Sequence, residues 1–111
     1  MDEEIKAWLY DILQSINEIE DYFTDQPKQF EAYTKDIKTK RAVERNLEII
    51  GEAANRIVKA NPNFTLTNVK QIIGTRNRII HGYDTISDEL IWSIIINHLP
   101  QLKSETEEIL H

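Results

Sequence analysis

The sequence predicts an all-α protein, an antiparallel bundle of four main helices and one short helix. Two observations predict this fold class. Apolar residues recur three and four positions apart through several long segments, which is the spacing of amphipathic helices. No segment shows a convincing strand alternation, and the chain contains no internal repeat or low-complexity tract. Helices of this kind bury their apolar stripes against one another, so residues 1–111 are expected to form one domain.

The first helix is predicted over residues 5–23. Residues 2–4 are acidic and suit the positive end of its dipole. The segment DQPKQF interrupts the pattern, and Pro27 is expected in the first turn of the short helix that follows. The apolar stripe of the first helix consists of Ile5, Trp8, Leu9, Ile12, Leu13, Ile16, Ile19 and Phe23.

A long helix is predicted over residues 35–60. Small side chains at Gly51, Ala53 and Ala54 allow another helix to approach it closely. Its buried stripe is expected to consist of Val43, Leu47, Ile50, Ala54 and Ile57.

The segment NPNF (61–64) ends the long helix, and Thr65 or Thr67 is expected to cap a shorter one. The shorter helix carries Val69, Ile72, Ile73 and Ile79.

The last helix is predicted over residues 88–110, directly after Ser87. Its segment IWSIII has the propensity of a strand, but the apolar period and the length favour a helix. One side of it is expected to carry Leu90, Ile91, Ile94, Ile95, His98 and Leu102.

Composition excludes several classes of site. The chain has no cysteine, so it forms no disulfide, thiolate metal site or thiol nucleophile. The N-terminal MDEEIK is acidic where a secretory signal is basic, and the apolar stretch LIWSIII is far shorter than the roughly 20 residues that span a bilayer. We therefore expect a cytoplasmic protein without a membrane segment.

The net charge of −6 opposes binding to nucleic acid, but the charge is unevenly distributed. Residues 1–31 hold nine acids and two lysines, a net charge of −7. Residues 32–111 hold eleven bases and ten acids, a net charge of +1. The basic segment KDIKTKRAVER (35–45) is expected to be a solvated helix face.

The segment GTRNRIIHGYD (74–84) concentrates side chains that bind phosphate and transfer protons. It holds two of five arginines, one of three histidines and one of four tyrosines. Arginine is a permanently charged fork that matches phosphate oxygens, and histidine exchanges protons near neutral pH. RNA cleavage without a metal needs a base for the 2′-hydroxyl, charge stabilisation at phosphorus and an acid for the 5′-oxygen. A two-fold dimer would supply a second histidine for the second proton transfer.

Spacing restricts how these side chains can meet. In an uninterrupted helix, Arg76 and His81 lie about 140° apart around the axis. They converge only if the helix ends near His81, where Gly82 can release the backbone, or if a second chain supplies the missing partner. Arg78 lies three residues from His81 and shares its face. Spacing alone favours a simpler alternative, in which these basic residues compensate the negative end of a helix.

The flanking residues carry a resemblance to a known family. RNRIIHGY (76–83) follows the pattern arginine, four residues, histidine, one residue, tyrosine. AVERNLEIIGEAANRI (42–57) precedes it and HLPQL (98–102) follows it. In this order and spacing, the chain resembles the HepT-like branch of the HEPN superfamily over nearly its whole length. Thr75 departs from the larger apolar residue that relatives often carry, and FTLTNVK lacks their tryptophan.

The resemblance implies an HEPN-like homodimeric ribonuclease that needs no cofactor, the toxin of a HepT/MNT-type toxin–antitoxin pair. Its partners would be an RNA substrate and a minimal nucleotidyltransferase antitoxin. Arg76 would hold the scissile phosphate and His81 would provide acid–base catalysis without a metal. Asn77 and Arg78 would support them, and Tyr83 resembles the tyrosine that the antitoxin modifies with AMP.

Two other readings of the same residues stay open. One is a non-catalytic module that presents a nucleotide or Tyr83 to a nucleotidyltransferase. The other is a structural helical dimer in which the arginine–histidine segment only caps a helix.

Other polar residues are assigned structural roles. Glu44, Glu48 and Glu52 have helical spacing that imitates a metal face, but they are expected to pair with Arg41, Arg45 and Arg56.

Two further histidines and the tryptophans are also expected to be structural. His98 lies on an apolar stripe and is expected in the core or an interface, whereas His111 is terminal. Trp8 and Trp92 are expected in the core, with a dimer seam as the alternative.

Overall fold

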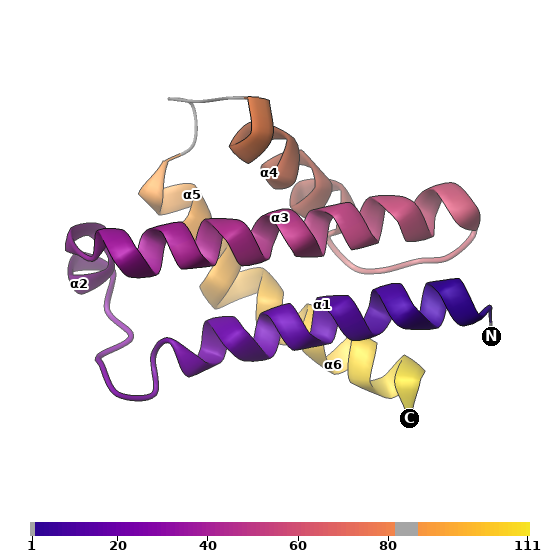
Figure 1. Cartoon of the computed structure of the whole chain (residues 1–111), viewed down its shortest axis with the longest axis horizontal. Coiled ribbons are helices and arrows are strands. Elements are labelled where there is room, and N and C mark those ends of the chain that lie inside the picture. The colour runs from indigo at the N-terminus through magenta and orange to yellow at the C-terminus, as the bar shows by residue number, and fades with distance from the viewer. Residues whose placement is uncertain (1, 82–86) are drawn as a thin grey trace.

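The computed structural model describes residues 2–81 and 87–111, and every regular element in those ranges is a helix (Figure 1). This confirms the predicted all-α class. The last predicted helix is continuous but has three parts, in which a π-helical turn, η2, joins two α-helical segments. The elements are α1 (Glu3–Asp21), α2 (Phe30–Lys35), α3 (Ile37–Ala60), α4 (Val69–His81), α5 (Asp88–Ser93), η2 (Ile94–His98) and α6 (Leu99–Leu110).

Helix α1 begins where its cap requires. The Asp2 carboxylate accepts hydrogen bonds from the backbone N–H groups of Glu4 at 2.7 Å and Ile5 at 3.3 Å. These bonds satisfy donors that have no partner within the helix, so α1 starts two residues before the predicted position. Its buried apolar residues are Ile5, Leu9, Ile12, Ile16 and Ile19.

The expected position of Pro27 was wrong. Helix α2 begins at Phe30, so Pro27 lies before the helix and not in its first turn. Helix α2 packs against Trp92 of α5. Its Tyr33 and Phe30 rings lie 5.3 Å and 6.0 Å from the Trp92 ring, measured between centroids. Trp92 therefore packs against the core, as predicted.

Helix α3 is the central element of the fold. It packs most extensively against α1 and α4, and Figure 1 shows α1 and α3 side by side and antiparallel. The last helix crosses these two obliquely in the same view. All residues of the predicted α3 stripe are buried, namely Val43, Leu47, Ile50, Ala54 and Ile57.

Gly51 lets α4 approach α3 closely, as the small residues predicted. A Cβ atom added to Gly51 would lie 2.2 Å from Cβ of Arg76 and 2.9 Å from its Cγ. Real side-chain atoms cannot approach so closely, so any larger residue at position 51 would push the two helices apart. The glycine therefore determines where Arg76 lies.

The predicted caps of α4 were also wrong. The helix begins at Val69, and neither Thr65 nor Thr67 occupies its capping position. Instead, the backbone N–H of Thr67 donates to the Glu105 carboxylate at 3.0 Å, and its hydroxyl donates to the same carboxylate. This contact fastens the start of α4 to α6, which sequence spacing could not reveal.

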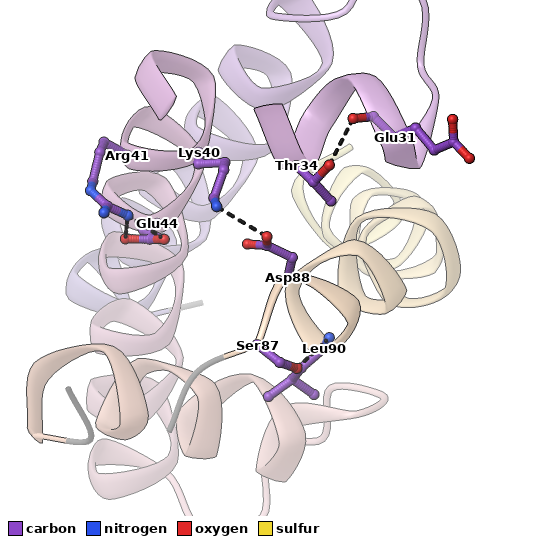
Figure 2. Close-up of polar contacts among 8 residues, drawn as sticks. All are labelled: Glu31, Thr34, Lys40, Arg41, Glu44, Ser87, Asp88 and Leu90. Atoms are coloured by element: carbon purple, nitrogen blue, oxygen red, sulfur yellow. Dashed lines mark hydrogen bonds and ion pairs between the residues drawn. The ribbon is translucent and has the colours of Figure 1, made fainter. Parts of the chain in front are cut away.

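The last helix starts as predicted, since the Ser87 hydroxyl accepts the backbone N–H of Leu90 at 3.1 Å. The Lys40 ammonium lies 3.0 Å from the Asp88 carboxylate and ties α3 to α5 (Figure 2).

A proline explains why the last helix is not α-helical throughout. Pro100 has no N–H to donate, and its ring crowds the carbonyl four residues earlier. In the preceding turn, the N–H of Leu99 bonds to the carbonyl of Ile94, five residues back. We infer that this wider turn accommodates Pro100 without ending the helix.

The molecule is a thin slab that measures 41 × 30 × 19 Å. Its shortest dimension is close to two helix diameters, so each helix has one face near the surface. Within the described ranges, no helix combines the length and apolarity needed to cross a bilayer.

The two helical glycines predict opposite effects on stability. Gly51→Ala places a methyl group against Arg76 and should lower the free energy of unfolding by about 1–3 kcal/mol. Gly74→Ala meets no atom within 4 Å and should raise it by about 0.5–1 kcal/mol, because alanine favours helix. Urea unfolding at one protein concentration measures both. Equal stability of Gly51→Ala and the wild type would contradict the close approach of α3 and α4.

Candidate functional site

Arg76 lies in the seam between α4 and α3. Its side chain is 22% exposed. One terminal nitrogen, Nη2, donates to the Glu52 carboxylate of α3, and the other, Nη1, donates to the side-chain oxygen of Asn77 at 2.8 Å. The second oxygen of Glu52 accepts a hydrogen bond from Nε of Arg56 at 3.0 Å. A single carboxylate therefore holds two arginines in fixed positions.

The Glu52 carboxylate is held in its charged form. Burial opposes that charge, but hydrogen bonds and positive charges from Arg56 and Arg76 outweigh it and hold the pKa of Glu52 below its ordinary value of 4.5. A charged Glu52 keeps the guanidinium of Arg76 oriented at neutral pH.

The hydrogen-bonding capacity of Arg76 is not fully used among the described residues. Its Nε atom is buried and has no hydrogen-bond partner among the described residues. Buried donors nearly always have a partner, so this atom is a place where a water molecule or an anion can bind. Guanidinium groups match the oxygens of phosphate especially well.

A pocket of about 220 Å³ surrounds the Arg76 side chain. Its floor is α3, and α1 and α4 form its sides. The pocket contains three arginines and three carboxylates, so its formal charge is close to zero. An anion that binds here must compete with Glu52 for Arg76. The lining residues are Trp8, Asp11, Arg45, Glu48, Ile49, Glu52, Ala53, Arg56, Arg76 and Ile80.

Asn77, Arg78 and His81 are exposed on α4. His81 is the last residue of α4 within the described range, and residues 82–86 lie outside it, so the expected helix end near His81 stays a prediction. However, Arg76 and His81 both lie within α4, about 140° apart around its axis. His81 does not line the Arg76 pocket. One chain therefore does not bring these two side chains together, and Arg78 is the arginine that shares the His81 face.

Gly82 and Tyr83 lie outside the described residues, so the modification expected at Tyr83 stays a prediction.

The acidic row on α3 forms the predicted ion pairs. Arg41 lies 3.1 Å from Glu44, Arg45 lies 3.6 Å from Glu48, and Arg56 pairs with Glu52. Residues 2–81 and 87–111 contain no group of three or more histidine, cysteine or acidic side chains arranged to hold a metal ion.

The contact between Glu52 and Arg76 could not be predicted from the sequence. Helical spacing predicts the pair of Glu52 with Arg56, four residues away, but contains no signal for a contact between helices. For the same reason, the sequence did not predict that Trp8 and Asp11 of α1 line the pocket. Trp8 packs against the core from the pocket side, so the core prediction for this residue holds.

The unusual Thr75 is buried without disturbing the helix. Its hydroxyl donates to the backbone carbonyl of Gln71 at 2.8 Å, so the polar atom is satisfied inside α4. The departure from a larger apolar residue therefore leaves no unpaired group in the core.

Fold and site together define a class of protein. It is a helical bundle in which one helix carries an arginine, an asparagine and a histidine within six residues, beside a pocket that the arginine lines. Residues 12–109 match the family described as "Ribonuclease HepT-like". That match covers most of the chain, so the protein belongs to this family of ribonucleases. The resemblance carried by RNRIIHGY and its flanking segments is thereby confirmed.

Similar proteins include two from Methanocaldococcus jannaschii. "Putative RNase MJ0127" is 38% identical over 108 residues, which are 96% of this chain and 88% of the relative. "Putative RNase MJ1380" is 36% identical over 106 residues, which are 94% of each chain. "Probable ribonuclease HepT" of Thermococcus cleftensis is 31% identical over 108 residues, also 94% of each chain. No solved structure matches the chain.

The shared carboxylate predicts a pH-dependent contribution to stability. The folded pKa of Glu52 lies below its unfolded value, so its contacts stabilise the fold above the unfolded pKa and are lost as the pH falls through the folded one. At pH 7, Glu52→Gln should lower the free energy of unfolding by roughly 0.5–1 kcal/mol, a range typical of exposed ion pairs. Urea unfolding at pH 7 and pH 3 measures the difference between variant and wild type. If the difference in free energy of unfolding between variant and wild type is as large at pH 3 as at pH 7, the charge of Glu52 does not contribute to stability.

Proposed function

We propose that this protein is a metal-independent endoribonuclease and the toxin of a HepT/MNT-type toxin–antitoxin system, and that it acts in the cytoplasm as a single domain over residues 1–111. One observation carries the proposal. Arg76 and His81 belong to the same short helix, yet they face directions about 140° apart. Two such helices, related by a two-fold axis, can place the arginine of one chain near the histidine of the other.

Arg76 is suited to hold the scissile phosphate. Asn77 and Glu52 each take one of its terminal nitrogens, while Nε has no partner among the described residues. Two contacts fix the plane of the guanidinium, and the second hydrogen of each terminal nitrogen is left for phosphate oxygens. As negative charge builds on the phosphorus centre, this oriented charge stabilises it without having to move.

His81 is suited to exchange protons. It is exposed at the end of α4, where a substrate can reach it. One histidine takes the proton from the 2′-hydroxyl, whose oxygen attacks phosphorus. The bond from phosphorus to the 5′-oxygen breaks, and the histidine of the second chain protonates that oxygen. The products are a 2′,3′-cyclic phosphate and a free 5′-hydroxyl, and no metal takes part.

The partner of the toxin is a minimal nucleotidyltransferase. The basis for this is the resemblance of Tyr83 to the tyrosine that such antitoxins modify with AMP. The added phosphate would bring negative charge to the segment that follows His81 and compete with RNA for the arginines.

Cleavage should depend on both proposed residues. His81→Ala and Arg76→Ala should each reduce the cleavage rate by about 10²–10⁴-fold, which is typical for loss of acid–base or charge-stabilising groups. His111→Ala removes an exposed terminal histidine and is the matched control, which should keep the wild-type rate. Gel assays with EDTA present measure the rate, and mass spectrometry identifies the cyclic phosphate.

Rapid cleavage by a folded His81→Ala protein would contradict this assignment. Loss of cleavage in EDTA would contradict metal independence. A different outcome is a wild-type protein that carries AMP on Tyr83 and cleaves no RNA, either before or after the AMP is removed. That result would favour the alternative function, a non-catalytic partner of a nucleotidyltransferase.

The two-chain site makes a separate prediction. If each cleavage needs His81 from both chains, equimolar mixing of wild type with His81→Ala should leave about a quarter of the rate that wild type shows at the same total protein concentration, because only homodimers of wild type are active. If each chain acts alone, about half should remain. Cleavage is measured after subunit exchange, which a tagged variant verifies by co-purification. A linear dependence on the fraction of wild-type chains would contradict the shared site.

A further inference from the structure

A second pocket lies on the other flank of α4, between this helix and the last helix. Its volume is about 250 Å³. Unlike the Arg76 pocket, its lining contains no carboxylate among residues 2–81 and 87–111, although the whole chain is acidic. It combines two basic side chains, neutral polar groups and an apolar wall. The lining residues are Gln71, Gly74, Thr75, Arg78, Leu90, Ser93, Ile94 and His98.

Gly74 keeps the mouth of this pocket open. A glycine inside a helix costs about 1 kcal/mol relative to alanine, so it usually reflects packing or function. Packing explains Gly51, where a Cβ would collide with Arg76. No such reason exists at Gly74, where a Cβ would meet nothing within 4 Å. A backbone left bare beside a pocket allows a ligand to approach closely.

His98 lines the same pocket from the last helix. The residue is half-buried, and its Nδ1 atom is buried without a hydrogen-bond partner among the described residues. It is also the last residue of the π-helical turn η2. Turns of this kind occur often at functional sites. The expectation that His98 lies in a core or an interface did not foresee this pocket.

We propose that this pocket binds one nucleotide of the RNA substrate, next to the scissile phosphate. This inference rests on the proposed function. Arg78 binds the flanking phosphate, the base lies against the apolar side chains of Leu90 and Ile94, and His98 and Ser93 bond to its polar edge.

Size and position favour a unit of RNA over a free small molecule. The pocket is smaller than the roughly 300–1,000 Å³ of typical ligand sites, so it suits one unit of a polymer. Arg78 lies one helical turn from His81 on the same face of α4, so a nucleotide held by Arg78 has its neighbour at the proposed catalytic histidine. Proteins read unpaired RNA by combining such base and phosphate contacts.

Binding of a short single-stranded RNA with a 2′-deoxy substitution at the cleaved position tests the pocket without cleavage. Arg78→Ala should weaken binding about tenfold and reduce the salt slope of log K by about 0.7, the value for one phosphate contact with a single strand. Gly74→Leu should also weaken RNA binding about tenfold, because the leucine side chain fills the mouth of the pocket. Gly74→Ala should weaken it much less. Lys28→Ala, which removes a charge from the segment between α1 and α2, should bind within about twofold of wild type.

Wild-type affinity in both folded Arg78→Ala and Gly74→Leu would overturn the proposal. The proposal would also be overturned if light scattering showed that Gly74→Leu dissociates the dimer. That result would identify this face as a protein interface. Cleavage assays distinguish failure of the nucleotide site from failure of the proposed ribonuclease function. If the pocket variants bind RNA as wild type does and cleave it normally, only the nucleotide site is overturned. Pocket-dependent binding by a wild-type protein that never cleaves overturns only the catalytic proposal.

Discussion

The close approach of α3 and α4 at Gly51 is the constraint on which the rest of the site depends. Because position 51 has no side chain, the stem of Arg76 lies directly against the α3 backbone. The neighbouring Glu52 then reaches the guanidinium, and Asn77 holds it from the other side. Had the helices been held apart by a larger residue, Arg76 would extend into solvent and lose the contacts that orient it.

The contact between Glu52 and Arg76 contributes to the stability of the fold and also orients the guanidinium of Arg76. Glu52 offsets the positive charge of two arginines in the free protein, and it also prevents Arg76 from rotating. An oriented but incompletely satisfied guanidinium is suited to receive a phosphate, because little further ordering is needed when the substrate binds. In the proposed function, the carboxylate would compete with the phosphate for Arg76, which would favour release of the RNA after cleavage.

Helix α4 separates two unlike environments. One flank carries the balanced charges of the Arg76 pocket, and the other carries the pocket of Arg78 and His98, in which the described lining residues include no acid. The exposed residues Asn77 and His81 lie between these flanks. In the proposed function, a single helix would contact successive parts of an RNA strand, with a different chemical task on each face.

The sequence by itself determined the helices, because the period of apolar residues reports directly which face each helix buries. Every predicted stripe residue of α3 is buried, and Ser87 caps the last helix as expected. Local signals failed where distant residues decide the outcome. Pro27 does not start α2, because Trp92 anchors that helix, and Thr67 bonds to Glu105 instead of capping α4.

The functional residues divide in the same way. The segment RNRIIHGY and its flanks identified the family, and helical periodicity alone implied that Arg76 and His81 diverge. Only the tertiary structure decided that Glu52 and Asn77 orient Arg76, and that Arg78 and His98, twenty residues apart, line one pocket. Periodicity describes one helix at a time, whereas a site is made of contacts between helices, and those depend on how side-chain volumes pack.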